Sequence, residues 1–102
     1  MDDELRKDLI GAIAPLVPGW TVVILSEGDH YRVAQERERR LLGRIKLAPD
    51  RLPIVDLRQE GADWTGQAHL GTGKDVEALI KKVFLAHGKV LGISRFRVSR
   101  GK

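Results

Sequence analysis

The chain has 102 residues, 42% hydrophobic and 31% charged, which is typical of one soluble globular domain. The absence of cysteine excludes disulfides, thiolate metal sites and cysteine nucleophiles. The net charge is +4, and residues 81–102 hold seven Lys or Arg and no Asp or Glu, an asymmetry that favours an anionic partner.

The domain organisation follows from the same composition. We expect residues 1–102 to form a single domain, with a frayed tail at 99–102. No apolar run approaches the roughly 20 residues that span a bilayer. Residues 1–4 are acidic, unlike the basic leader of a signal peptide, so we expect a cytoplasmic protein without a membrane segment.

The first predicted element is a helix. Apolar residues recur at helical spacing over 5–17, and acidic residues at 2–4 favour the positive end of the helix dipole. Pro15 lacks a backbone N–H, so we expect an irregular last turn. Residues 20–25 follow as a strand that is apolar on both faces, which predicts a place in the middle of a sheet.

A β-hairpin is predicted over residues 30–47. The stretches 31–33 and 43–47 alternate like strands, and the charged residues 36–40 are expected at its solvent-exposed tip. Residues 35–42 are also good helix formers, so a short helix there is the alternative.

Two more strands precede the second helix. Pro53 is compatible only with a sheet edge or the start of a strand, and residues 54–58 form a short strand. Residues 64–70 alternate, so the core side takes Trp64, Ala68 and Leu70, and the other side takes Thr65, Gln67 and His69.

The second helix is predicted over residues 72–88. Thr72 and Asp75 resemble a capping box, and one apolar stripe contains Val76, Leu79, Ile80, Val83 and Phe84.

Residues 90–98 are the last predicted strand. Phe96 and Val98 lie on one face, and Arg95 and Arg97 on the other. This strand is either an edge or a pairing surface between two subunits, so a monomer and a homodimer are both compatible with it.

Together the elements predict an α+β fold, an antiparallel sheet of about four to six strands with two helices packed on it, in the order α-β-β-β-β-β-α-β. The expected core includes Leu9, Ile13, Val23, Leu25, Trp64, Leu79, Ile80, Val83 and Phe84. With the lysines of the second helix, the element order resembles that of a double-stranded-RNA-binding domain, which adds to the expectation of a polyanion partner. In that family the second helix begins with a lysine cluster, whereas residues 73–77 of this chain contain both acidic and basic side chains.

No constellation of catalytic or metal-binding residues stands out. The three histidines lie in separate elements, and nothing in the sequence requires His69 to meet Asp56 or Asp63 across a sheet. No serine lies in a nucleophile elbow. We therefore expect a non-catalytic protein without cofactor or metal.

The basic residues carry the functional prediction. Arginine supplies 11 of the 18 cations, and its planar fork suits phosphate. We predict a small domain that binds a polyanion, in the first place the backbone of DNA or RNA, with Arg32 of the hairpin a further candidate contact. The site residues are Arg37, Arg39, Arg40, Arg44, Lys81, Lys82, Lys89, Arg95, Arg97 and Arg100.

The alternative is a protein-interaction module, such as a small inhibitor, immunity or accessory protein. It would dock through the charged hairpin or the C-terminal edge strand. Glu36 and Glu38 alternate with arginines in the hairpin, and carboxylates at a phosphate contact are repulsive, so this segment suits a protein partner better than DNA.

Overall fold

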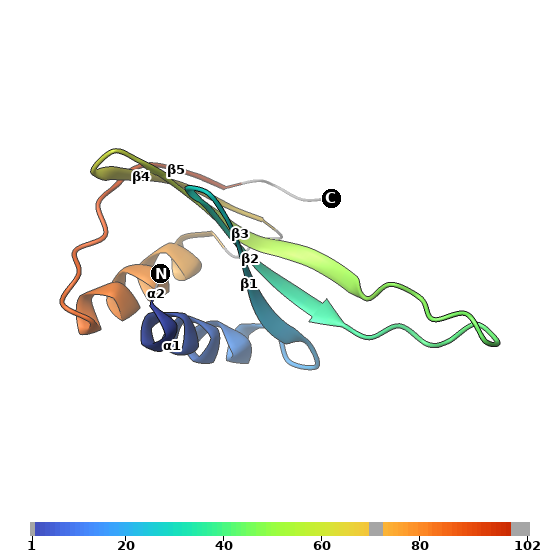
Figure 1. Cartoon of the computed structure of the whole chain (residues 1–102). Coiled ribbons are helices and arrows are strands. Elements are labelled where there is room, and N and C mark those ends of the chain that lie inside the picture. The colour runs from blue at the N-terminus through green and yellow to red at the C-terminus, as the bar shows by residue number, and fades with distance from the viewer. Residues whose placement is uncertain (1, 70–72, 99–102) are drawn as a thin grey trace.

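Two helices cover one face of a five-stranded sheet in the computed structural model, which describes residues 2–69 and 73–98 (Figure 1). The elements are α1 (Asp3–Ile13), the 3-10 turn η1 (Ala14–Leu16), β1 (Thr21–Glu27), β2 (His30–Arg37), β3 (Asp50–Glu60), β4 (Asp63–Ala68), α2 (Gly73–Ala86) and β5 (Ile93–Val98). The predicted α+β class is confirmed, and the number of strands lies within the expected range. Among the described residues, neither helix combines the length and apolarity that a membrane crossing needs.

The strands lie in the sheet in chain order, β1-β2-β3-β4-β5. The first four form an antiparallel meander, but β5 runs parallel to β4. The sheet is therefore mixed rather than wholly antiparallel. The cause is α2, because a helical crossover returns the chain to the end of the sheet where β4 began.

The first helix begins as its sequence predicts. The Asp2 side chain accepts a hydrogen bond of 2.8 Å from the backbone N–H of Leu5, which caps the helix. Leu5, Leu9 and Ile13 recur every four residues, and all three are buried against the sheet. The irregular turn expected at Pro15 is confirmed, because the chain tightens into η1 there.

The first strand is an edge strand, which corrects the predicted position in the middle of the sheet. Its only neighbour among the described residues is β2. Val22 and Ile24 are buried under the helices, whereas Val23 and Leu25 point to the opposite face, where Leu25 is 38% exposed. Val23 and Leu25 were therefore wrongly assigned to the core. Alternation places them correctly only when it is known which face the helices cover.

The hairpin is longer than predicted, and its second strand is a different segment. Residues 43–47 do not form a regular strand, and β2 pairs instead with β3. Within the described residues, four strands rather than five therefore precede α2. The reason is burial, because this pairing sets Tyr31 opposite Leu57 and Val33 opposite Val55 on the covered face.

The ends of the expected hairpin tip also differ. Residues 36 and 37 belong to β2, and residues 38–49 form a non-helical connection to β3, which excludes the alternative of a short helix. Pro53 lies beside a register shift in the β2–β3 pair, in a part of β3 that is not paired with β4. The edge environment predicted for this proline is confirmed.

The remaining elements follow the predicted alternation. Trp64 and Ala68 face the helices, and Val76, Ile80 and Phe84 of α2 are buried, with Leu79 and Val83 half-buried beside them. The last strand starts at Ile93 rather than at residue 90, although Leu91 before it is buried. The predictions for Leu70, Thr72 and the tail 99–102 concern residues outside the described part of the chain.

Gly66 is the position where β4 tolerates no side chain. A Cβ at this residue would lie 2.7 Å from a ring carbon of Phe96 and 3.4 Å from a methyl carbon of Leu57. Because such overpacking forces neighbours to move, we expect Gly66→Ala to lower the free energy of unfolding by about 1–3 kcal/mol. Urea unfolding followed by tryptophan fluorescence measures this change.

Gly11→Ala is the matched control. Gly11 lies within α1, and a Cβ there meets nothing within 4 Å. The same substitution should therefore raise the free energy of unfolding by about 0.5–1 kcal/mol through helix propensity. A Gly66→Ala protein as stable as the wild type would contradict the close packing of β4 against β5.

Candidate functional site

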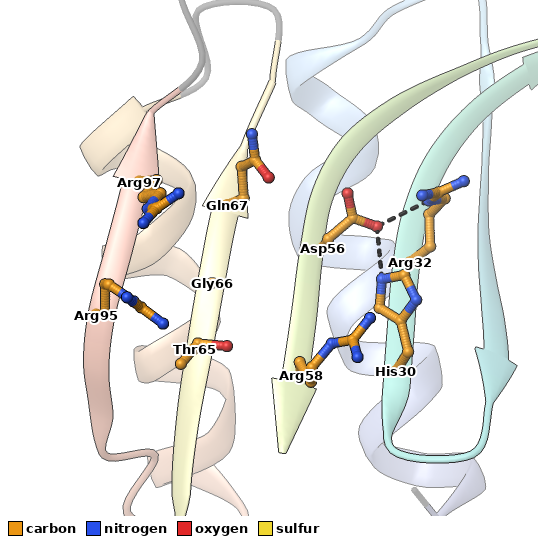
Figure 2. Close-up of a pocket in the computed structure, with 9 residues that line it drawn as sticks. All are labelled: His30, Arg32, Asp56, Arg58, Thr65, Gly66, Gln67, Arg95 and Arg97. Atoms are coloured by element: carbon orange, nitrogen blue, oxygen red, sulfur yellow. Dashed lines mark hydrogen bonds and ion pairs between the residues drawn. The ribbon is translucent and has the colours of Figure 1, made fainter. Parts of the chain in front are cut away.

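The sheet face away from the helices carries a polar cavity of about 340 Å³ (Figure 2). Apart from Gly66, alternate residues of four strands line it, because side chains at positions i and i+2 share a face. The strand register brings them side by side, with Arg32 opposite Asp56 and Thr65 opposite both Arg58 and Arg95. The lining residues are His30, Arg32, Asp56, Arg58, Thr65, Gly66, Gln67, Arg95 and Arg97. We refer to this surface as the open face.

Asp56 is the hydrogen-bonding centre of the open face. Its Oδ1 atom accepts a hydrogen bond from His30 Nε2 at 2.9 Å and another from Arg32 Nε at 2.7 Å (Figure 2). Its Oδ2 atom accepts from His69 Nε2 at 2.6 Å. An ionised carboxylate only accepts hydrogen bonds, so both imidazoles carry a hydrogen on Nε2.

The ionisation of Asp56 is fixed by opposing effects. Its side chain is only 17% exposed, and burial raises its pKa. Hydrogen bonds from Arg32, His69 and His30, together with the charge of Arg32, outweigh burial and hold the pKa of Asp56 below its ordinary value of 3.8. Asp56 is therefore a carboxylate at neutral pH.

Three arginines of the open face are available to a ligand. Arg58 of β3 and Arg95 and Arg97 of β5 are exposed, and none has an ion-pair partner in the part of the chain that the structure describes. Asp56 is the one carboxylate in the cavity lining, and its acceptor atoms already serve three donors. The cavity thus has excess positive charge and free guanidinium forks, which suits a phosphate or another oxyanion.

Of the predicted site residues, Arg95 and Arg97 line the cavity. Arg37 and Arg39 instead approach Asp50 at 3.7 and 3.5 Å, and the Arg37 guanidinium also lies 4.4 Å from the ring centre of Trp20. These contacts occupy both arginines at the outer ends of β2 and β3.

The other predicted residues lie elsewhere. Arg40 and Arg44 belong to the connection between β2 and β3, and Lys81 and Lys82 are exposed on α2, away from the open face. Lys81 pairs with Glu77 at 3.0 Å, Lys89 contacts Asp2 at 3.3 Å, and Arg100 lies outside the described residues. The described members of the predicted set therefore do not form one surface.

His30 and Arg58 were missed as site residues, and Arg32 was considered only as part of the hairpin. Alternation within 54–58 places Arg58 on the sheet face opposite to that of Leu57. The register of β3 between β2 and β4 is needed to show that His30 and Thr65 are its neighbours. His69 does contact Asp56, which nothing in the sequence required.

No family model, curated protein or solved structure matches this chain. Within residues 2–69 and 73–98, no group of three or more His, Cys, Asp or Glu side chains is placed to hold a metal ion.

Asp56→Asn tests the hydrogen-bonding centre. At pH 7 we expect the substitution to lower the free energy of unfolding by about 1 kcal/mol, because it removes charge-assisted hydrogen bonds that water partly screens. The pKa of Asp56 is lowered by folding, so this stabilisation is present above pH 3.8 and is lost as the pH falls through the lower native value.

Urea unfolding of the wild type and of Asp56→Asn at about pH 7 and about pH 2.5 gives the comparison. The difference in unfolding free energy should shrink at the lower pH. Asp63→Asn is the control, since Asp63 is exposed at the start of β4 and should change stability by less than about 0.5 kcal/mol. A difference that is the same at both pH values would contradict the role given to Asp56.

Proposed function

We propose that this protein binds a polyanion, in the first place the phosphate backbone of a nucleic acid, through the open face of its sheet. The observation that carries the proposal is a set of three exposed arginines along a polar cavity, Arg58, Arg95 and Arg97, which have no ion-pair partner among the described residues. Phosphate contacts of this kind supply most of the affinity of sequence-independent binding.

The distribution of the cations favours a polymer over a small anion. These three arginines come from β3 and β5, on either side of β4, so they are spread across the sheet rather than gathered around one point. Further cations lie on the connection that extends β2 and β3. A backbone with a charge at every nucleotide can engage such a row, whereas a single phosphate reaches only part of it. The proposal includes a cytoplasmic location.

A protein partner is the second candidate. The edge of β5 is unpaired among the described residues, and Leu41 and Leu42 are 63% and 68% exposed on the connection between β2 and β3. A sheet edge and exposed apolar side chains are both typical of protein docking. Salt separates the two candidates, because backbone binding weakens steeply with ionic strength and a desolvated protein interface does not.

Charge reversal on β5 tests nucleic-acid binding. We expect Arg95→Glu/Arg97→Glu to abolish binding to generic duplex DNA and RNA at ~50 mM salt. The melting temperature should change little, because both side chains are exposed on the face opposite to Phe96. Fluorescence anisotropy of labelled duplexes measures binding, and circular dichroism measures melting.

Lys81→Glu/Lys82→Glu is the matched control, with the same change in net charge on the helical side of the molecule. It should retain binding. In a salt titration, Arg95→Ala/Arg97→Ala should lower the slope of log affinity against log salt by about 0.7–0.9 for each lost contact. Equal loss of binding in both charge-reversal variants would indicate a non-specific effect of net charge and would contradict a site on the open face.

A further inference from the structure

Residues 38–49, called the arm, extend β2 and β3 beyond the body of the protein (Figure 1). The end of the arm is a tight turn. The backbone N–H groups of Leu42 and Ile45 each donate to the carbonyl oxygen of the other residue at 3.0 Å. Gly43 between them has a φ of 62°, which favours glycine. The arm therefore presents a narrow, hydrogen-bonded tip.

The tip exposes large apolar side chains. Leu41, Leu42 and Ile45 are 63%, 68% and 63% exposed. Exposed aliphatic residues are common singly, but three of them at the end of one projecting segment form a patch that favours contact with a partner.

The charges of the arm divide it into a neutralised base and a cationic tip. At the base, Glu36 accepts from Arg51 Nε at 2.9 Å, and Asp50 faces Arg37 and Arg39. In the sequence, the Glu36 carboxylate was an argument against a nucleic-acid contact, because it would repel phosphate. In the structure, the ion pair with Arg51 neutralises the charge of Glu36.

Toward the tip the cations are not compensated. Arg40, Arg44 and Lys46 have no acidic partner in the part of the chain that the structure describes. Glu38 is the one carboxylate between residues 38 and 49. Apolar side chains flanked by cations fit a partner that is anionic at its surface and apolar within.

We propose that the arm tip enters the minor groove of duplex DNA, where Leu42 or Ile45 wedges between base pairs and kinks the duplex. This inference rests on the proposed function and adds to it a substrate form, a deformable DNA duplex. Leucine and isoleucine are among the side chains that partly unstack base steps, with kinks of about 20–90°. Arg40 and Arg44 beside them suit the negative potential of the minor groove.

Continuity with the open face favours DNA over an anionic membrane, which is the other surface that attracts apolar and cationic side chains. The arm continues β2 and β3, and β3 carries Arg58 on the open face. A duplex bent at the tip can contact both the arm and this arginine. A flat lipid surface that meets a projecting tip leaves the open face without a ligand.

The test uses the full chain and a DNA duplex with a donor and an acceptor dye at its ends. Binding is followed by anisotropy, and bending by energy transfer between the ends. The variant Leu42→Ser/Ile45→Ser removes the wedge at exposed positions. Leu85→Ser/Val90→Ser is the matched control, because Leu85 and Val90 are also exposed, at 64% and 88%, but lie in and after α2.

We expect the wild type and the control to raise energy transfer on binding. Leu42→Ser/Ile45→Ser should bind with an affinity within about tenfold of the wild type, because the lost contacts are offset by the avoided cost of bending, and should leave energy transfer at the value of free DNA. This result supports the wedge.

Four results would overturn it. Binding of the wild type without bending, or equal bending by Leu42→Ser/Ile45→Ser, would remove the wedge and leave the proposed function intact. No binding of the wild type to DNA or RNA would remove both. Co-sedimentation with phosphatidylserine vesicles that depends on Leu42 and Ile45, without any DNA bending, would assign the tip to a membrane.

Discussion

The packing of both helices against one face of the sheet is the constraint on which the rest of the structure depends. Leu9 of α1 and Ile80 of α2 are buried in the same cluster as Leu57 of β3. Burial of such side chains is the main favourable contribution to folding. Because strand residues alternate, every second side chain is directed to the uncovered face. That face can carry charge without placing any in the core.

A face rich in arginine needs some compensation, and Asp56 provides it. This carboxylate accepts from His30 and Arg32 on β2 and from His69 just after β4, so it connects the neighbours of β3 on both sides. Arg58 of β3 and Arg95 and Arg97 of β5 are not used in this network. The charges that stabilise the sheet and the charges proposed to bind a ligand thus belong to different residues of the open face. Substitutions can therefore alter one set without removing the other.

The local parts of this architecture could be predicted from sequence, and the non-local parts could not. Helical periodicity and the capping Asp2 define α1, and alternation assigns Arg95 and Arg97 to the face opposite to Phe96. These features depend on neighbours in the chain. Three other features depend on strand pairing and register, which are set by contacts between distant segments. They are the edge position of β1, the pairing of β2 with β3 across the arm, and the presence of Arg58 and the β5 arginines in one cavity lining.

Anion binding at the open face can be tested directly by an NMR titration of the 15N-labelled protein with a short DNA duplex at low salt. We expect shifts of the guanidinium Nε–Hε resonances of Arg58, Arg95 and Arg97, which diminish as salt is added. The backbone resonances of α2 around Lys82 should stay in place. Shifts confined to α2, or no shifts at low salt, would contradict the assignment of the open face as the anion-binding surface.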